Sequence, residues 1–270
     1  MKSKKIIVAG TALASVFMFA GCNSQNNNTS NETQANQTQT SEWISLFNGK
    51  DLTGWKIKFK GHPLGENYLD TFGVKDGKLT VSYDNYSQFD NKFGHIFYDH
   101  AFSNYIIKLE YRFIGEQVYG GAAWAFRNNG IMLHSQAPET MALEQDFPRS
   151  IEVQLLGAYD DQKPRTTANI CTPSTNVVIN KKLVTDHCIN STGKALPLNE
   201  WVQAEIEVHG SEKIIHRING EVVFEYEQPQ FEPNSSEAKG LDNLLINKGY
   251  ISLQAESHPT EFRNIMLKQL

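Results

Sequence analysis

The sequence has no cluster of lysine and arginine residues, and its formal net charge is −5. Nucleic-acid-binding domains usually carry a basic patch, so we expect no nucleic-acid partner. Long helical patterns are also lacking, which argues against a parallel sheet built from alternating strands and helices. No internal repeat of constant period stands out, and this argues against a repeat protein.

Cysteine is scarce, with three residues in a chain of 270. If Cys22 belongs to an N-terminal anchor, as argued below, Cys171 and Cys188 are left as an even pair. In an exported protein such a pair predicts a disulfide, which would close a loop of about 17 residues. The alternative is a metal site that also uses His187, but two thiols with adjacent ligands make a poor metal pattern.

The N-terminal residues 1–22 have the features of an export signal. A positively charged start is followed by the apolar run Ile6–Phe19, which is too short to span a membrane comfortably. The run ends in Ala20-Gly21-Cys22, which resembles the bacterial lipoprotein box except that Phe19 stands where Leu is more usual. We therefore expect an exported bacterial lipoprotein on the periplasmic or cell-surface side, anchored to the membrane by a lipid on Cys22. The alternative is an ordinary secretory signal with an incidental cysteine.

Residues 23–40 consist almost wholly of Asn, Gln, Thr and Ser and contain no aromatic side chain. This composition predicts a disordered linker, because it cannot bury apolar surface. The remaining residues 41–270 are long enough for one all-β domain. About a dozen short strand patterns with frequent turn signals predict a sandwich or jelly roll of antiparallel sheets.

Several turns and strands are clearly marked in this domain. Asp76-Gly77 and Asn219-Gly220 each stand between two strand-like runs, which predicts two hairpins. Residues 122–126 and 130–136 are expected to be strands joined by a turn. Residues 157–197 are expected to be a long irregular stretch, and loops of this length in a compact domain are usually functional.

Polar side chains that can bind ligands or transfer protons alternate with apolar ones on three strands. Glu152 and Gln154 share a face in 150–157, as do His134 and Gln136 in 130–136. In 249–258 the shared face carries Ser252, Gln254, Glu256 and His258. Alternation also marks ordinary solvated faces, but these faces carry no lysine and are rich in Gln, Glu and His. Such groups hydrogen bond to hydroxyls and transfer protons near neutral pH, so we expect a functional cleft.

The motif Leu46–Trp55 (LFNGKDLTGW) resembles the opening of the 3-keto-disaccharide hydrolase domain family. Segments 127–134, 150–157, 201–208 and 249–263 match the same family, with Asn129 where Ser is more common. The resemblance covers 43–270 and implies a concanavalin A-like jelly roll. It also implies substrates that are glycosides with a ketone at carbon 3, cleaved with a hydrolase or lyase outcome. A companion sugar oxidoreductase would supply that ketone.

The resemblance suggests roles for the polar side chains. Removal of the carbon 2 proton by Glu152 or His134 is expected, with the other residue acting as acid or orienting the sugar. Gln154 and Gln254 are expected to bind hydroxyls or the ketone oxygen. Further candidates, each with a structural alternative, are Glu256, His258, Arg263 as an oxyanion stabiliser or as an ion-pair partner of Glu261 or Glu256, and His187 as a cap over the cleft. A divalent metal held by His134 and Glu152 is an open alternative, although no compact ligand motif is present.

Two other functions are compatible with the expected fold. A non-catalytic carbohydrate-binding surface lipoprotein would need aromatic platforms but not Glu152 or His134. A retaining glycosidase would need two close carboxylates, commonly from the pattern Glu-x-Asp-x-x-Glu on one strand. Gln154 and Gly157 occupy the later positions of that pattern, which argues against the glycosidase.

Overall fold

The structure is a computed structural model that describes residues 42–270. The predicted export signal, the lipidation site Cys22 and the polar linker lie outside the described residues. Every helix in the described part is too short or too polar to cross a membrane.

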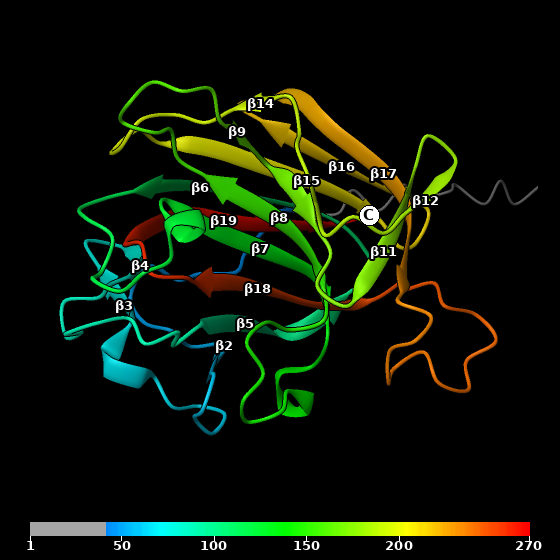
Figure 1. Cartoon of the computed structure of the whole chain (residues 1–270), viewed down its shortest axis with the longest axis horizontal. Helices are drawn as coiled ribbons and strands as arrows, with labels where there is room; N and C mark the ends of the chain where they lie inside the picture. Colours follow the sequence, from blue (N-terminus) through cyan, green and yellow to red (C-terminus); the bar gives the residue numbers. More distant parts are fainter. Residues whose placement is uncertain (1–41) are drawn as a thin grey trace, which may run out of the picture. The chain divides into compact units, whose positions relative to one another are not determined.

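The chain folds into two large antiparallel sheets that form an all-β jelly roll (Figure 1). The ten-stranded sheet has the order β12 (Lys182–Val184), β11 (Thr175–Ile179), β17 (Glu221–Phe231), β16 (Lys213–Ile218), β15 (Val202–His209), β6 (Asn104–Phe113), β19 (Thr260–Gln269), β4 (Lys78–Val81) and β3 (Phe72–Lys75), and β1 (Ile44–Ser45) also pairs with β19. The seven-stranded sheet has the order β13 (Cys188–Ile189), β10 (Asn169–Cys171), β8 (Ile151–Leu156), β7 (Asn128–Ser135), β18 (Gly249–Ala255), β5 (Gly94–Phe102) and β2 (Trp55–Phe59). A small third sheet pairs β14 (Gly193–Lys194) with β9 (Thr166–Thr167).

The hydrophobic core is built from alternate residues of both large sheets. On the seven-stranded sheet, Ile151, Val153 and Leu155 of β8 are completely buried. On the ten-stranded sheet, Ile206 and Val208 of β15 are completely buried as well. Because side chains alternate along a strand, burying this set turns Glu152 and Gln154 toward the other face of β8.

The two predicted hairpins are confirmed. Asp76-Gly77 connects β3 to β4, and Asn219-Gly220 connects β16 to β17. Both residues of each turn have positive φ angles, at 50° and 72° in the first and 50° and 88° in the second. This conformation matches the twist of the flanking strands, which is why these residue pairs are strong hairpin signals.

Two expectations about secondary structure are wrong. Residues 122–126 form a short 3₁₀ helix, η2 (Ala123–Ala125), whose backbone bonds run from Ala125 N to Ala122 O and from Phe126 N to Ala123 O. A short apolar run does not by itself distinguish a strand from a buried turn. Residues 157–197 are not irregular, because they contain six strands, β9 to β14. Each has only two to five residues, which is too short to give a periodic signal.

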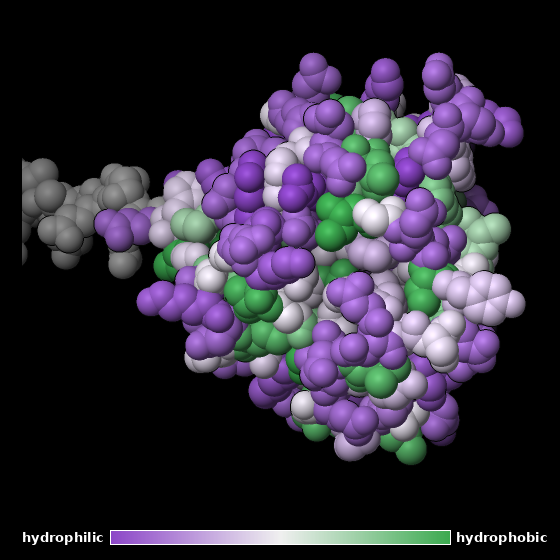
Figure 2. All heavy atoms as spheres, turned by 90° about the vertical axis from the view of Figure 1, so that its left-hand side faces the viewer, coloured by the Kyte–Doolittle hydropathy of each residue, from purple (hydrophilic) through white to green (hydrophobic). Residues whose placement is uncertain are grey.

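The remaining short helices lie in loops around the sheets. They are η1 (Tyr68–Asp70) and η3 (Pro138–Thr140). Figure 2 shows the face at the left of Figure 1, where small apolar groups are scattered among polar side chains.

Candidate active site

The polar face of β8 forms the floor of a cavity. Residues paired across an antiparallel ladder point to the same side, so Glu152 lies beside Met132 of β7 and Cys171 of β10. The cavity has a volume of about 370 Å³. It is lined by Trp124, Asn128, Phe147, Glu152, Gln154, Cys171, Pro173, His187, Cys188 and Glu256.

The carboxylate of Glu152 lies over Gly130 of β7, which has no side chain. A Cβ atom at Gly130 of β7 would lie 2.6 Å from Glu152 Oε1 and 2.9 Å from its Cγ. The glycine therefore leaves the space that the carboxylate occupies. The side chain is almost fully buried, and this burial raises the pKa of Glu152 to about 8.

Glu256 directly follows β18 and lines the same cavity. Burial raises the pKa of Glu256 well above the ordinary value, and the charge on Glu152 raises it further. Two carboxyl groups in this situation do not both ionise easily, so Glu256 keeps its proton when Glu152 ionises at a pH of about 8. Once Glu152 ionises, the site combines a carboxylate that can accept a proton with a carboxylic acid that can donate one.

Several buried polar atoms near the carboxylates have no hydrogen-bond partner within residues 42–270. They are both ring nitrogens of His95, Asn128 Oδ1, Ser252 Oγ, both amide atoms of Gln254, and Glu256 Oε2. Gln254 pairs in register with His95 of β5, so these side chains share one strip of the seven-stranded sheet. Buried polar groups are normally hydrogen-bonded. A strip of unpaired donors and acceptors is therefore suited to a ligand with many hydroxyl groups.

His95 is held in its neutral form. Burial lowers the pKa of His95 to about 3, and the positive charge of Lys58 contributes. Lys58 pairs in register with His95 and donates hydrogen bonds to the carbonyl oxygens of Phe59, His62 and Leu143. A neutral imidazole has one donor and one acceptor nitrogen, which again suits binding to hydroxyls.

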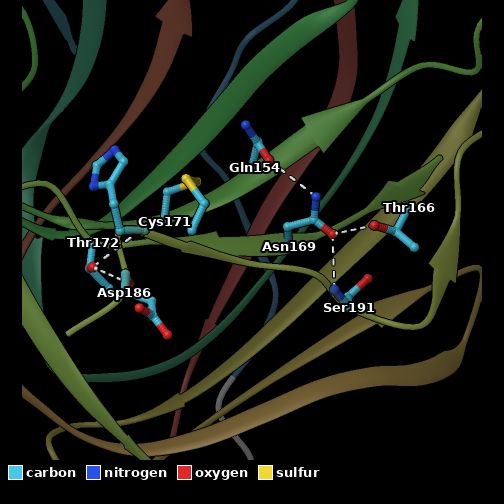
Figure 3. Close-up of a disulfide and its surroundings, with 9 residues drawn as sticks. Gln154, Thr166, Asn169, Cys171, Thr172, Asp186 and Ser191 are labelled. Carbon is cyan, nitrogen blue, oxygen red and sulfur yellow. Dashed lines mark hydrogen bonds between the residues drawn. A yellow bond between two sulfur atoms is a disulfide. The ribbon is translucent and has the colours of Figure 1, made fainter. Parts of the chain in front are cut away.

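Gln154 is oriented by a neighbouring strand (Figure 3). Asn169 of β10 donates from Nδ2 to Gln154 Oε1 over 3.1 Å. Asn169 Oδ1 in turn accepts from Thr166 Oγ1 at 2.8 Å and from Ser191 N at 2.9 Å. This chain of contacts fixes the amide of Gln154 so that its nitrogen remains available at the cavity wall.

The wall opposite β7 contains a disulfide between Cys171 and Cys188. The expected pair is therefore joined in the structure, and both cysteines line the cavity. His187 lines it too, and its carbonyl oxygen accepts from Thr172 N at 2.9 Å. The expected position of His187 at the cleft agrees with this placement.

His134 does not share the cavity with Glu152, and this expectation is corrected. The φ angle of His134 is +48°, so the alternation of side chains breaks near the end of β7. Its Nε2 atom lies 2.9 Å from the carbonyl oxygen of Gly210, in the turn between β15 and β16. The second carboxyl group that lines the cavity with Glu152 is Glu256, whereas His134 is absent from the lining. The two residues of the open metal alternative, His134 and Glu152, are separated in the same way.

His258 and Arg263 also lie outside the cavity lining. Ser257 has a φ angle of +85°, and beyond it the His258 ring packs between Phe113 and Phe126. Arg263 belongs to β19 in the ten-stranded sheet, where its Nε donates to Glu110 Oε2 at 2.8 Å. The ion-pair alternative for Arg263 is thus the one observed, although its partner is neither Glu256 nor Glu261.

Residues 42–270 contain no group of three or more His, Cys, Asp and Glu side chains arranged to hold a metal ion.

Some cavity residues were not predicted from the sequence. Trp124 and Phe147 lie in connections between strands, where the sequence gives no periodic signal. Asn128 of β7 lines the cavity and His95 of β5 is buried outside its lining, and strand alternation is the signal that could have found both. His95 was obscured because its neighbours Ile96 and Phe97 are both apolar and buried.

A family described as the 3-keto-alpha-glucoside-1,2-lyase-like domain matches residues 42–268. None of the curated proteins matches the chain.

Among solved structures, one candidate glycosyl hydrolase from Parabacteroides distasonis ATCC 8503 is 17% identical, with a TM-score of 0.52 over 85% of this chain and 100% of that one. A second candidate glycosyl hydrolase from that organism is 19% identical, with a TM-score of 0.49 over 84% of this chain and 94% of that one. The carbohydrate-binding module CBM66 from Bacillus subtilis is 8% identical, with a TM-score of 0.46 over 86% and 98% of the two chains. The first of these likenesses supports the jelly-roll fold.

Proposed function

Because the chain belongs to the family of the 3-keto-alpha-glucoside-1,2-lyase-like domain, we propose that it cleaves glycosides that carry a ketone at carbon 3 of the sugar. The family makes the chain a carbohydrate-active protein, and the chemistry of the cavity supports the proposed reaction. The observation that carries the proposal is that Glu152 and Glu256, both buried and both with raised pKa values, line one cavity beside unpaired amide and imidazole groups.

In the proposed reaction, Glu152 is the general base. The ketone at carbon 3 acidifies the hydrogen on carbon 2, and the Glu152 carboxylate takes that proton. The electrons of the broken C–H bond form an enolate with the ketone oxygen. When the enolate collapses, a double bond forms between carbons 1 and 2 and the bond from carbon 1 to the leaving oxygen breaks. The products are an unsaturated keto-sugar and an alcohol, and addition of water to the double bond gives net hydrolysis.

Glu256 is the proposed general acid. Both its burial and the charge on Glu152 favour its protonated form, so it holds a proton when Glu152 does not. That proton goes to the leaving oxygen as its bond to carbon 1 breaks. A base with a pKa near the working pH and a neighbouring neutral acid are what such an elimination requires.

The charge that develops on the ketone oxygen needs a hydrogen-bond donor. Gln254 is completely buried behind the residues that line the cavity and is not itself among them, but its unpaired Nε2 group lies in the buried strip that also contains Glu256 Oε2. We assign this amide to the ketone oxygen. Gln154 and Asn128 line the cavity and are assigned to the sugar hydroxyls.

The decisive experiment compares a glucoside with its 3-keto form as substrates. The wild-type protein should release the leaving group from the keto form only. Glu152→Gln and Glu256→Gln should each lower kcat by about 100-fold or more. Glu110→Gln, on the ten-stranded sheet, is the matched control and should retain activity. Parallel assays with a chelator report whether a divalent metal contributes.

Two outcomes would replace this proposal. Sugar binding without turnover of either substrate would make the protein a carbohydrate-binding module, a function that the exposed Trp124 at the cavity also favours. Cleavage of the unoxidised glucoside would make it an ordinary glycosidase. The lipid anchor at Cys22 and the companion oxidoreductase stay predictions.

A further inference from the structure

We propose that Trp124 is the binding platform for the leaving group and selects leaving groups with a flat apolar face, such as an aryl group or a second sugar ring. The inference rests on the proposed function, because it assigns the part of the substrate that departs. The site residues expected from the sequence do not include Trp124.

Trp124 is unusually exposed for so large an aromatic side chain. Its exposed fraction is 55%, yet it lines the same cavity as Glu256 and Glu152. It sits in η2, whose Ala125 is completely buried and fixes the turn to the body of the domain. The tryptophan therefore stands at the cavity wall with part of its ring open to solvent.

The ring is supported from behind by other aromatic side chains. Phe93 stacks on Trp124 with ring centroids 6.1 Å apart and an interplanar angle of 22°. Phe93 itself packs against Phe89 at 5.2 Å and Phe147 at 4.8 Å. A supported ring loses little conformational freedom when a ligand packs on it, so the contact is favourable for binding.

The loop of Trp124 is tied to the loop of the general acid. Gln117 Nε2 donates to the carbonyl oxygen of Ala122 at 2.9 Å and to Ser257 Oγ at 2.8 Å. Val118 N donates to Ser257 O at 3.0 Å. Because Ser257 follows Glu256 directly, these bonds hold the platform in a fixed position relative to the acid.

The position of the acid decides which part of the substrate meets the platform. Glu256 gives its proton to the leaving oxygen, so the group attached to that oxygen lies on the acid side of the cavity. Among the residues that line the cavity, Trp124 is the exposed aromatic one, and its loop is bonded to Ser257, next to the acid. The C–H face of a sugar ring or the face of an aryl ring can pack on it, whereas a methyl group is too small to cover it.

The test compares three 3-keto-glucosides that differ only in the leaving group, namely methyl, phenyl and glucosyl. Trp124→Ala should lower kcat/KM for the phenyl and glucosyl substrates by about 10-fold, and for the methyl substrate by less than about 2-fold. Trp124→Phe should recover most of the loss. Trp43→Ala removes an exposed tryptophan that packs on Lys108 of β6, away from the cavity, and should change none of the three values. An equal loss for all three leaving groups would overturn the inference.

A binding measurement separates this inference from the proposed reaction. Calorimetry with the unoxidised phenyl and methyl glucosides, which do not need to react, should show phenyl binding weakened about 10-fold by Trp124→Ala. Methyl binding should stay unchanged. If the wild type turns over no 3-keto substrate, the proposed reaction fails while this readout still decides the role of Trp124. Equal weakening of the binding of both glycosides, or no binding of either by the wild type, would overturn the proposed role of Trp124 as a platform.

Discussion

Glu152 and Glu256 share a buried environment in which a second negative charge is costly. The apolar neighbours of the cavity remove water from the carboxyl groups, and no nearby cation is needed to explain their states. The pKa of Glu152 rises to about 8 through burial, and that of Glu256 rises further above its ordinary value because of the charge on Glu152. Consequently, proton transfer at this site depends on pH in a way that a surface carboxylate would not show.

The pKa of Glu152 predicts how activity and stability change with pH. Activity should rise as the pH approaches about 8, because only the ionised Glu152 accepts a proton, and should fall when Glu256 ionises as well. Stability should change in the opposite sense. The folded-state pKa of Glu152 lies above the ordinary value of 4.5. Its contribution to the free energy of unfolding is therefore fully present below pH 4.5 and is lost as the pH rises through about 8.

Urea unfolding of wild type and Glu152→Gln at acidic and alkaline pH checks this prediction. The advantage of the glutamine variant should grow with pH by up to roughly 1.4 kcal/mol per unit. Parallel stability curves for the two proteins would contradict it.

The glycine beneath Glu152 gives a second prediction. In Gly130→Ala, the new Cβ would lie 2.6 Å from Glu152 Oε1, so the carboxylate must move away from its position in the cavity. We expect kcat to fall by about 10-fold or more, with a smaller effect on stability. Gly73→Ala in β3 is the control, since its Cβ would meet only Thr80 Oγ1 at 3.4 Å. Retained activity in Gly130→Ala would place the reacting carboxylate elsewhere.

At the scale of elements, the site is made by the polar faces of β8 and β7, the end of β18, and the disulfide-linked edge of β10 and β13. Alternation in the sequence correctly placed Glu152 with Gln154, and it grouped Gln254 with Glu256. It failed for His134 and His258, because positive φ angles at His134 and Ser257 turn the chain out of the extended pattern. Such local angles depend on contacts with the opposite sheet and leave no mark in the residue pattern.

Arg263 shows a second limit of strand patterns. Alternation indicates which side chains share a face of one strand, but it does not indicate which strands become neighbours. β19 joined β6 and β4 in the ten-stranded sheet, so Arg263 meets Glu110 instead of the cavity. Pairing between distant strands is set by the packing of the whole domain.

The disulfide-linked edge gives a third prediction. β13 has two residues and pairs with β10, next to the bond between Cys171 and Cys188, which are 17 residues apart. The double variant Cys171→Ser/Cys188→Ser should lose about 3 kcal/mol of unfolding free energy on the loop-entropy model, whose basis is disputed. It should also bind substrate more weakly, because His187 at the cavity is held by this edge.

Urea unfolding with and without reductant checks the role of the bond. Reductant should destabilise the wild type and leave the double variant unchanged. Equal stability of the two proteins under oxidising conditions would show that strand pairing alone fixes the edge.

At the scale of the whole molecule, the two sheets have separate tasks. The seven-stranded sheet carries the cavity, whereas the outer face of the ten-stranded sheet carries ion pairs such as Arg263 with Glu110 and Arg112 with Glu261. Arg112 and Arg263 also stack on Trp201, with their guanidinium carbons 4.6 and 4.0 Å from the ring centroid. These contacts stabilise the outer face of the ten-stranded sheet and do not reach the cavity.

This division gives a fourth prediction. Arg263→Ala should change kcat/KM by less than about 2-fold, because the side chain lies on the sheet that does not line the cavity. Its loss should cost about 1 kcal/mol of stability or less, as is typical of partly exposed ion pairs. Steady-state kinetics and thermal unfolding measure the two effects. A loss of activity comparable to that of Glu152→Gln would show that Arg263 takes part in the reaction.

Glu152 and Glu256 come from parts of the chain about a hundred positions apart, and β7 lies between their strands. No early fragment of the growing polypeptide holds both carboxyl groups. After dilution from denaturant, the rate at which turnover returns would thus report the docking of the last strand. Fluorescence or circular dichroism would record the earlier collapse of the chain.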